Sequence, residues 1–133
     1  MKRFLLFLNF LVGFATTSSA QERSLTINDV SIIEIAPNGN TWIGSKTLGC
    51  QAYIPGTGTW LPVFDSTNTP MRSNNITAIS LYTINGVPHS FMGSTNGIGY
   101  RHGTAWDTIA GLPDRHIVDM IKSPDHVFYV ATK

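Results

Sequence analysis

The chain has 133 residues, of which 13% are charged and 11% aromatic, with 12 glycines and 7 prolines. A charged fraction well below the usual value of about 25% excludes charge-driven disorder and a coiled coil, and this composition favours many short strands over a helical bundle. The formal net charge is +1, and no basic patch of the kind that binds nucleic acid is visible.

Residues 1–20 have the layout of a secretory signal peptide. Lys2 and Arg3 form a positive start, residues 4–14 are mostly apolar, and residues 18–20 are small. The apolar run is shorter than the roughly 20 residues that cross a bilayer. We predict cleavage after Ala20 and an exported chain, periplasmic or extracellular, without a membrane span. Without Lys2 and Arg3, seven basic residues stand against eight acidic ones.

One pattern occurs three times in residues 21–133. It consists of an apolar strand, a turn, an aromatic strand that ends in a small hydroxyl residue, and a glycine-containing turn. The first strands start at Val30, Ile76 and Ile117, and the aromatic residues are Trp42, Phe91 and Tyr129. Trp60 and Trp106 extend the match into a last strand. The repeat length is about 40–50 residues, which is typical of stacked repeat units.

The turns of the first two copies carry Asn38-Gly39 and Asn85-Gly86. An Asn-Gly pair between two apolar strands predicts a hairpin with a type I′ turn, because that turn requires positive φ at both central residues. We therefore expect type I′ hairpins in both copies.

Small residues follow each aromatic at equivalent positions. Gly44, Gly93 and Ala131 predict a place where a neighbouring backbone comes close. The residues that come next are expected to bond the following turn through their hydroxyl groups: Ser45, Ser94 and Thr132.

A four-stranded unit that is apolar on both faces cannot bury itself alone, and units of this length pack around an axis as propeller blades. We predict an all-β fold, a β-propeller-type repeat of four-stranded antiparallel blades at about 28–70, 71–115 and 116–133. Propellers have about four to eight blades, whereas residues 21–133 hold about two and a half and the third copy stops after two strands. We expect an N-terminal piece of a longer protein or a truncated gene product, with an open edge and an exposed apolar face.

Residues 38–45 and 93–100 resemble the two-component regulator propeller repeat, which has Asp-Gly, an apolar residue and Trp before Gly-Thr, and then Gly-Leu and an aromatic. Residues 111–114 resemble the segment that joins its blades. The resemblance implies an exported sensor part of bacterial hybrid histidine kinases, often for polysaccharide fragments, or a secreted or type IX secretion protein.

A rival resemblance is to the Asp box of sialidase-type propellers. Gly39, Thr41 and Trp42 fit its spacing, but Ile35 and Pro37 stand where Ser and Asp belong. In the third copy Ser123 and Asp125 fit, while Val127 replaces Gly. A partial match at different positions in each copy is weak, and we expect a protein that is not an enzyme.

Candidate chemical groups are sparse. His116 and Asp119 would point to opposite faces of one strand. His89, His102 and His126 lack Cys or carboxylate partners at zinc spacing. Residues 93–99 are rich in glycine but lack the Lys-Ser/Thr of a phosphate loop.

Three further cases allow both a structural and a functional interpretation: two aspartates, two tryptophans and the cysteine. Asp107 and Asp114 suit solvated turns better than paired carboxylates for glycoside cleavage. Trp42 and Trp60 could stack on sugars if exposed, but their repeat positions favour the core. Cys50 is the only cysteine, so no intrachain disulfide can form, and a buried thiol is favoured over a nucleophile.

The sequence therefore predicts a non-catalytic, exported propeller fragment that binds or senses a ligand, a carbohydrate or another small molecule. The alternatives are a structural or secretion-associated propeller that contacts proteins, and a sialidase-type glycoside hydrolase fragment. No catalytic residue, metal site or cofactor is predicted, and no residue is assigned to ligand binding.

Overall fold

The computed structural model describes residues 25–112, 115–125 and 127–133. The predicted signal peptide, Pro113, Asp114 and His126 lie outside these ranges. All regular secondary structure in the described ranges is β-strand, and every strand pair is antiparallel. The predicted all-β class is confirmed.

The strands form three sheets in chain order, which we call blades 1, 2 and 3. Blade 1 contains β1 (Val30–Ile35), β2 (Thr41–Ser45), β3 (Cys50–Ile54) and β4 (Thr59–Trp60). Blade 2 contains β5 (Ile76–Ile84), β6 (Val87–Ser94), β7 (Gly97–His102) and β8 (Ala105–Thr108). Blade 3 contains β9 (Ile117–Lys122) and β10 (Phe128–Thr132).

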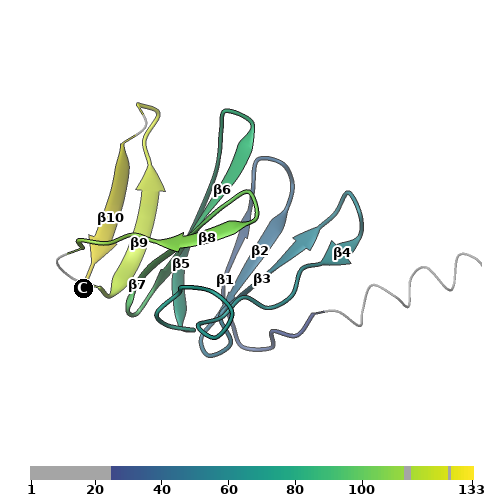
Figure 1. The fold of residues 1–133 in the computed structure, drawn as a ribbon, viewed down its shortest axis with the longest axis horizontal. Coiled ribbons are helices and arrows are strands. Elements are labelled where there is room, and N and C mark those ends of the chain that lie inside the picture. The colour runs from purple at the N-terminus through teal and green to yellow at the C-terminus, as the bar shows by residue number, and fades with distance from the viewer. Residues whose placement is uncertain (1–24, 113–114, 126) are drawn as a thin grey trace, which may run out of the picture.

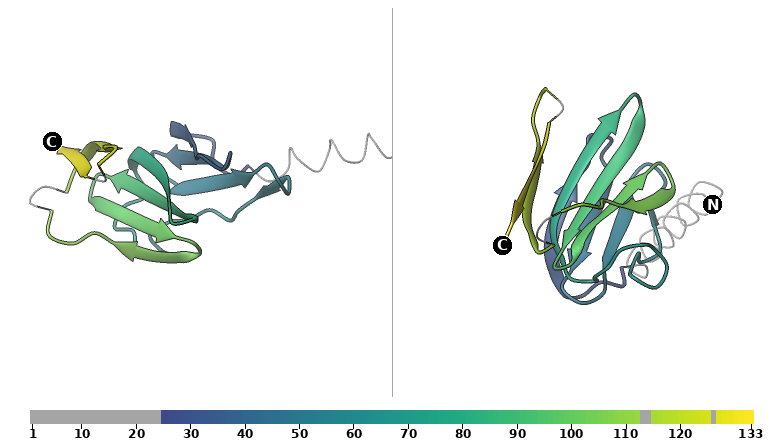
Figure 2. Two further views of the ribbon diagram at one scale, coloured as in Figure 1. Left: turned by 90° about the horizontal axis from the view of Figure 1, so that it is seen from above. Right: turned by 60° about the vertical axis from the view of Figure 1, so that its left-hand side comes forward.

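The three blades stand side by side and fan out from their first strands (Figure 1). β1 contacts β5, and β5 contacts β9, so the first strands form the inner line of the fan. Figure 2 shows the sheets as successive layers with blade 2 in the middle. The arrangement is that of an incomplete propeller whose sheets do not close into a ring.

The strand registers confirm the repeat. In each blade the first strand pair carries an irregularity of one residue at the same place, which falls beside Val30, Ile76 and Ile117. The aromatic residues also occupy one position, since Trp42, Phe91 and Tyr129 pair with Glu34, Ser80 and Ile121. The three segments therefore adopt one shape.

The two hairpin turns differ from each other. Asn85 and Gly86 have φ of 50° and 78°, so the type I′ prediction is confirmed there. In the first hairpin only Gly39 has positive φ, at 84°, and its N–H donates to Ala36 O at 2.8 Å. The type I′ prediction is wrong at this turn. Pro37 has no N–H to pair across a two-residue Asn-Gly loop, and its fixed negative φ suits the first central position of a type I turn followed by a left-handed glycine.

Neighbouring blades meet through one repeated contact. A Cβ on Gly44 would lie 2.7 Å from Cγ2 of Ile76, and a Cβ on Gly93 would lie 2.7 Å from Cγ2 of Ile117. The predicted close approach is therefore present, but the neighbour is an isoleucine side chain of the next blade and not a backbone. Both isoleucines are fully buried.

A hydrogen bond accompanies each of these contacts. Ser31 Oγ donates to Ile76 O at 2.6 Å, and Thr77 Oγ1 donates to Ile117 O, also at 2.6 Å. Ser31 and Thr77 are the residues that follow Val30 and Ile76. The junction between blades 1 and 2 is thus repeated between blades 2 and 3.

The hydroxyl residues at the ends of β2 and β6 hold the turns that follow. Ser45 Oγ accepts hydrogen bonds from the N–H groups of Thr47 and Leu48, at 3.0 and 2.8 Å. Ser94 Oγ donates to Gly97 O at 2.9 Å and accepts from the Asn96 N–H at 3.2 Å. The prediction for these two serines is confirmed.

The Gly93–Ile117 contact makes a stability prediction. Gly93→Ala is expected to destabilise the chain by about 1–3 kcal/mol, because the added methyl group overpacks the junction. Combining it with Ile117→Val should cost less than the sum of the two single changes, since the shorter valine can shift away from the new methyl group. Urea unfolding of the four proteins in a double-mutant cycle measures this coupling. Strict additivity would show that the two residues do not share one space.

Candidate functional site

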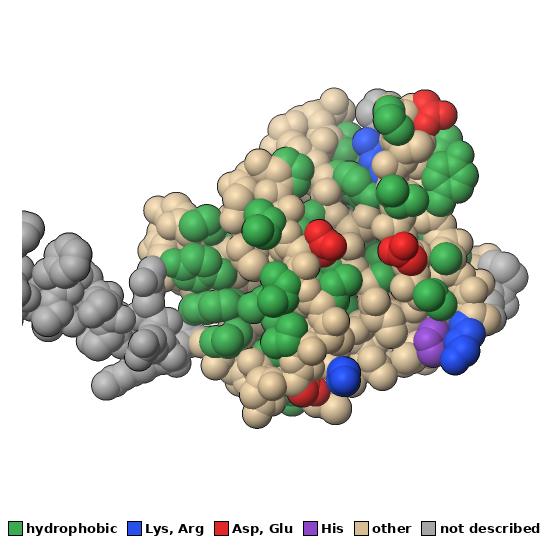
Figure 3. All heavy atoms as spheres, turned by 180° about the vertical axis from the view of Figure 1, so that it is seen from behind, with side chains coloured by type: hydrophobic (Ala, Val, Ile, Leu, Met, Phe, Trp, Pro, Cys, Tyr) green, Lys and Arg blue, Asp and Glu red, His purple; other side chains and the backbone are tan. Residues whose placement is uncertain are grey.

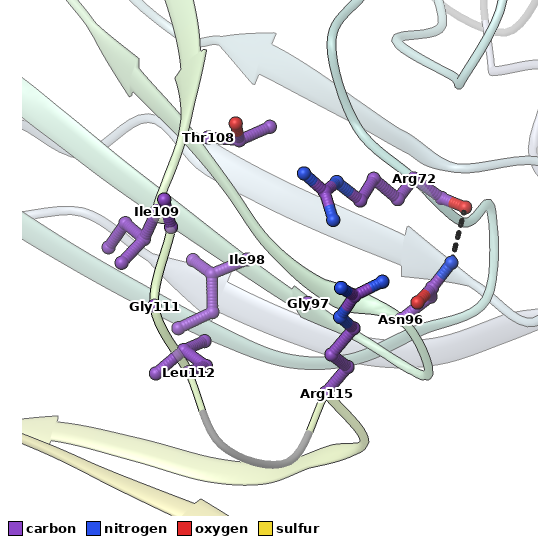
Figure 4. Close-up of a pocket in the computed structure, with 10 residues that line it drawn as sticks. Arg72, Asn96, Gly97, Ile98, Thr108, Ile109, Gly111, Leu112 and Arg115 are labelled. Carbon is purple, nitrogen blue, oxygen red and sulfur yellow. Dashed lines mark hydrogen bonds between the residues drawn. The ribbon is translucent and has the colours of Figure 1, made fainter.

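A pocket of about 190 Å³ lies at the end of blade 2 where the segments between blades enter β5 and β9 (Figure 4). It is bordered by the β6–β7 turn, by the chain after β8, and by an arginine from each entering segment. The described lining residues are Arg72, Asn96, Gly97, Ile98, Thr108, Ile109, Ala110, Gly111, Leu112 and Arg115.

The backbone at Arg72 is fixed by the buried side chain of Met71 and by hydrogen bonds to the β6–β7 turn. The Met71 side chain is buried and fills the space beside Gly99, where a Cβ would lie 2.4 Å from Met71 Cγ. The Arg72 carbonyl accepts a hydrogen bond from Asn96 Nδ2 at 3.4 Å (Figure 4). Ser73 Oγ and Thr95 Oγ1 share a further hydrogen bond of 2.9 Å. The backbone of Arg72 is thereby tied to the β6–β7 turn.

Arg115 is placed by the start of blade 3. Two residues later Ile117 is fully buried against Gly93. The carbonyl of His116 accepts a hydrogen bond from the Lys133 N–H at 3.0 Å. The exposed Arg115 side chain therefore projects from a fixed point of the backbone, and in Figure 4 its guanidinium group points into the same space as that of Arg72.

The described lining residues give the pocket a positive charge. Neither Arg72 nor Arg115 forms an ion pair with another described residue, and the described lining residues include no Asp or Glu. Two guanidinium groups that share one space repel each other, and an anion between them would remove that repulsion while accepting charge-assisted hydrogen bonds. Asn96 and Thr108 add neutral hydrogen-bonding groups at the edge.

The same pocket offers little for catalysis. Among its described lining residues there is no Cys, His, Asp or Glu, so these residues provide neither a nucleophile of ordinary type nor a general base near neutral pH. The arrangement can hold an anionic group.

The predicted histidines lie elsewhere. His89 and His102 are register partners at the far end of blade 2, with ring centroids 6.3 Å apart, and Tyr100 stacks on both rings. Burial lowers the pKa of His89, and the neighbouring His102 adds to that effect. Within the described ranges no three His, Cys, Asp or Glu residues come close enough to hold a metal ion.

The remaining candidates lie in or beside strands of blades 2 and 3. His116 directly precedes β9 and Asp119 lies within it, as a turn histidine followed by a strand aspartate would. Asp107 lies in β8, and its carboxylate accepts from the Thr108 N–H at 2.7 Å. Its suggested partner Asp114, like His126, falls outside the described residues.

Trp42 and Cys50 belong to the core, as predicted. Trp42 is 3% exposed and Cys50 is fully buried. Burial raises the pKa of the Cys50 thiol far above its usual range, which keeps the sulfur protonated and unreactive. Trp60 is half-buried and its ring lies 5.1 Å from that of Tyr53, on the side of blade 1 away from blade 2.

A second group of interest, Arg101, lies between blades 1 and 2. Its guanidinium carbon is 5.6 Å from the ring centroid of Trp42 and 5.4 Å from that of Phe64. Burial lowers its pKa, and its Nε and the Nε1 of Trp106 are buried without a hydrogen-bond partner in the described structure. Contact with two aromatic faces accounts for the position of this charge, and the adjoining cavity of about 50 Å³ is too small for an organic ligand.

The two pocket arginines were not identified from the sequence. Both precede a first strand, since Arg72 stands shortly before Ile76 and Arg115 shortly before Ile117. This shared position before a first strand is visible in the sequence. It indicates a common pocket only when the blades are known to pack side by side, because the two entering segments meet only in that arrangement.

No family model matches the chain, and no curated protein matches it significantly. Two solved structures of the extracellular domain of BT4673 from B. thetaiotaomicron, described as a one component system and as a hybrid two component system, are similar to it. Their TM-scores are 0.41 and 0.40, each with 19% identity, over 84% and 83% of this chain. The chain spans about a fifth of their length, 22% and 21%. In the described ranges no helix has the length and apolar character of a membrane span.

Proposed function

We propose that the chain is a non-catalytic binding module of an exported, propeller-type sensor, and that it holds a small anionic ligand between Arg72 and Arg115. The observation that carries this proposal is the convergence of two guanidinium groups, from two different segments, on one pocket whose described lining residues include no Asp or Glu.

The chemistry of the pocket favours a carboxylate or a sulfate. Guanidinium groups match both anions with paired N–H donors, and they remain charged at any physiological pH. Asn96 and Thr108 can bond hydroxyl groups next to the charge, and the side chains of Ile98, Ile109 and Leu112 give the pocket an apolar side. An acidic sugar combines a carboxylate or sulfate, hydroxyl groups and an apolar ring face.

The size of the pocket limits the ligand. Its volume of about 190 Å³ lies below the about 300–1,000 Å³ of pockets that enclose drug-sized molecules. We therefore propose that one acidic sugar residue, free or at the end of a short oligosaccharide, is the group recognised.

The test is calorimetric titration of the chain with galacturonate, glucuronate and a sulfated glucosamine, with glucose as the neutral comparison. The acidic sugars should bind and glucose should not. Arg72→Gln and Arg115→Gln should each weaken binding by about tenfold, which corresponds to about 1.4 kcal/mol, a typical loss for one charge-assisted contact near solvent.

The control variant is Lys46→Gln, which removes an exposed cation from the corresponding turn of blade 1. It should leave the affinity unchanged. Raising the salt concentration should weaken binding of the acidic sugars, because the contact is ionic. Equal binding of glucose, or arginine variants that bind as well as the unaltered chain, would refute the proposed site.

A further inference from the structure

Two buried N–H donors between blades 1 and 2 have no acceptor among the described residues. They are Nε of Arg101 in β7 and Nε1 of Trp106 in β8. The two residues are register partners, so their side chains lie on the same side of blade 2. Both contact the rings of Trp42 and Phe64. Because buried donors in folded proteins are nearly always bonded, two such neighbours indicate an acceptor that no described residue supplies.

The charge of Arg101 also lacks a partner. The Lys and Arg side chains visible in Figure 3 lie at separate places on the surface, where water solvates them. Arg101 is half-buried between two sheets, burial lowers its pKa, and it forms no ion pair with another described residue. The aromatic rings attract the cation, but a ring face accepts a hydrogen bond much more weakly than an anion does. An anion would satisfy the Nε–H and offset the charge together.

A cavity of about 50 Å³ adjoins Arg101. It is lined on one side by the β1–β2 hairpin of blade 1 and on the other by residues of β5, β6 and β7. Its described lining residues include Asn38, Asn40 and Ser90, and no Asp or Glu. Asn38 Oδ1 accepts the Asn40 N–H at 3.1 Å, which leaves the Nδ2 group of Asn38 to donate. The lining therefore favours an acceptor over a cation.

The volume of the cavity decides the size of that acceptor. It exceeds the roughly 30 Å³ that one water takes in the liquid, so the space suits one or two waters or a single small ion. A sugar or another organic anion does not fit. The half-buried guanidinium favours the ion over water, because a neutral water leaves the charge of Arg101 without compensation.

From these observations we propose that a monatomic anion of the halide class binds in this cavity against Arg101 and links the β1–β2 hairpin of blade 1 to blade 2. The inference is independent of the acidic sugar proposed above, which occupies a different pocket. A ligand of one atom contributes only a limited binding free energy, so half-saturation is expected at about 0.1 M chloride.

The first experiment is urea unfolding of the full chain at constant ionic strength, with sodium gluconate replaced stepwise by sodium chloride. Gluconate is too large for the cavity. The unfolding midpoint of the unaltered chain should rise with chloride and level off, because a ligand that binds only the folded state stabilises it. Arg101→Met keeps a long apolar side chain without the charge, and its midpoint should not show this saturating rise. Its response also measures the general effect of chloride on stability.

The matched control is Arg72→Gln, which removes a guanidinium group from the other pocket. It should keep the full chloride response while it loses affinity for acidic sugars, so the two proposals succeed or fail separately. A midpoint of the unaltered chain that does not depend on chloride would overturn the inference, since water would then suffice as the acceptor. A response that persists in Arg101→Met, or that disappears in Arg72→Gln, would overturn it as well.

A second measurement needs no variant that could fail to fold. Bromide quenches the fluorescence of an indole ring that it touches, and Trp42 is 3% exposed, so dissolved bromide hardly reaches it. Bromide bound beside Arg101 would lie against Trp42, which lines the same cavity. One component of the quenching should therefore saturate with bromide, and chloride should relieve it while gluconate should not. A purely linear rise that chloride leaves unchanged would exclude the site.

Discussion

Replacing Gly49 by alanine is expected to destabilise the chain by about 3 kcal/mol. Gly49 has φ of +91°, and a Cβ at this position would lie 2.1 Å from the carbonyl oxygen of Phe64. That oxygen accepts the Cys50 N–H at 2.9 Å, so the backbone cannot move without breaking a buried bridge. The left-handed conformation costs alanine about 1–2 kcal/mol and overpacking adds about 1–3 kcal/mol. Urea unfolding followed by tryptophan fluorescence measures the loss.

Gly86→Ala is the matched control for this prediction. Gly86 also has positive φ, at +78°, but a Cβ there would meet nothing within 4 Å. This variant should therefore lose only the conformational part, about 1 kcal/mol. If both variants lost the same amount, the contact between Gly49 and Phe64 would not contribute.

Ile79→Ala should destabilise the chain by about 3 kcal/mol, within the range of about 2–5 kcal/mol measured when a buried isoleucine is reduced to alanine. Ile79 is 6% exposed and packs in the core between blades 1 and 2, where it shares a cluster with Trp42, Met71 and Met92. The cost arises because the removed atoms leave a cavity that three fixed neighbours cannot fill. Thermal or urea unfolding provides the measurement.

Ile33→Ala is the same chemical change at the same position of the repeat, in a blade with no described neighbour on that side. Ile33 is 57% exposed, so this variant should lose less than about 1 kcal/mol. Both variants are compared in the same unfolding measurement. Similar losses in the two variants would mean that the side chain of Ile33 is buried as that of Ile79 is.

The sequence contained most of the fold because the repeat is local. Strand, turn and aromatic residues fall in register in three copies, and each copy forms its own hairpin from residues close in the chain. Asn85-Gly86 needed no tertiary information to be assigned correctly. The error at Asn38-Gly39 has a local cause too, since Pro37, immediately before the pair, has no N–H for the hydrogen bond that flanks a two-residue loop.

The candidate site was not predictable in the same way. Arg72 and Arg115 lie in different inter-blade segments, and nothing in the spacing of the sequence states that these segments meet at the end of blade 2. The same limit applies to Arg101, which contacts Trp42 and Phe64 of the preceding blade. Contacts between blades depend on packing angle and loop course, which are properties of the assembled sheets.

The central position of blade 2 bears on the order in which the chain can acquire structure during synthesis. A ribosome releases β1–β4 first, but the side of that sheet that carries Trp42 and Cys50 packs against residues that are made later, among them Met71, Ile76 and Met92. The apolar side of blade 1 therefore stays exposed during synthesis, where chaperones can bind it, until β6 has left the ribosome.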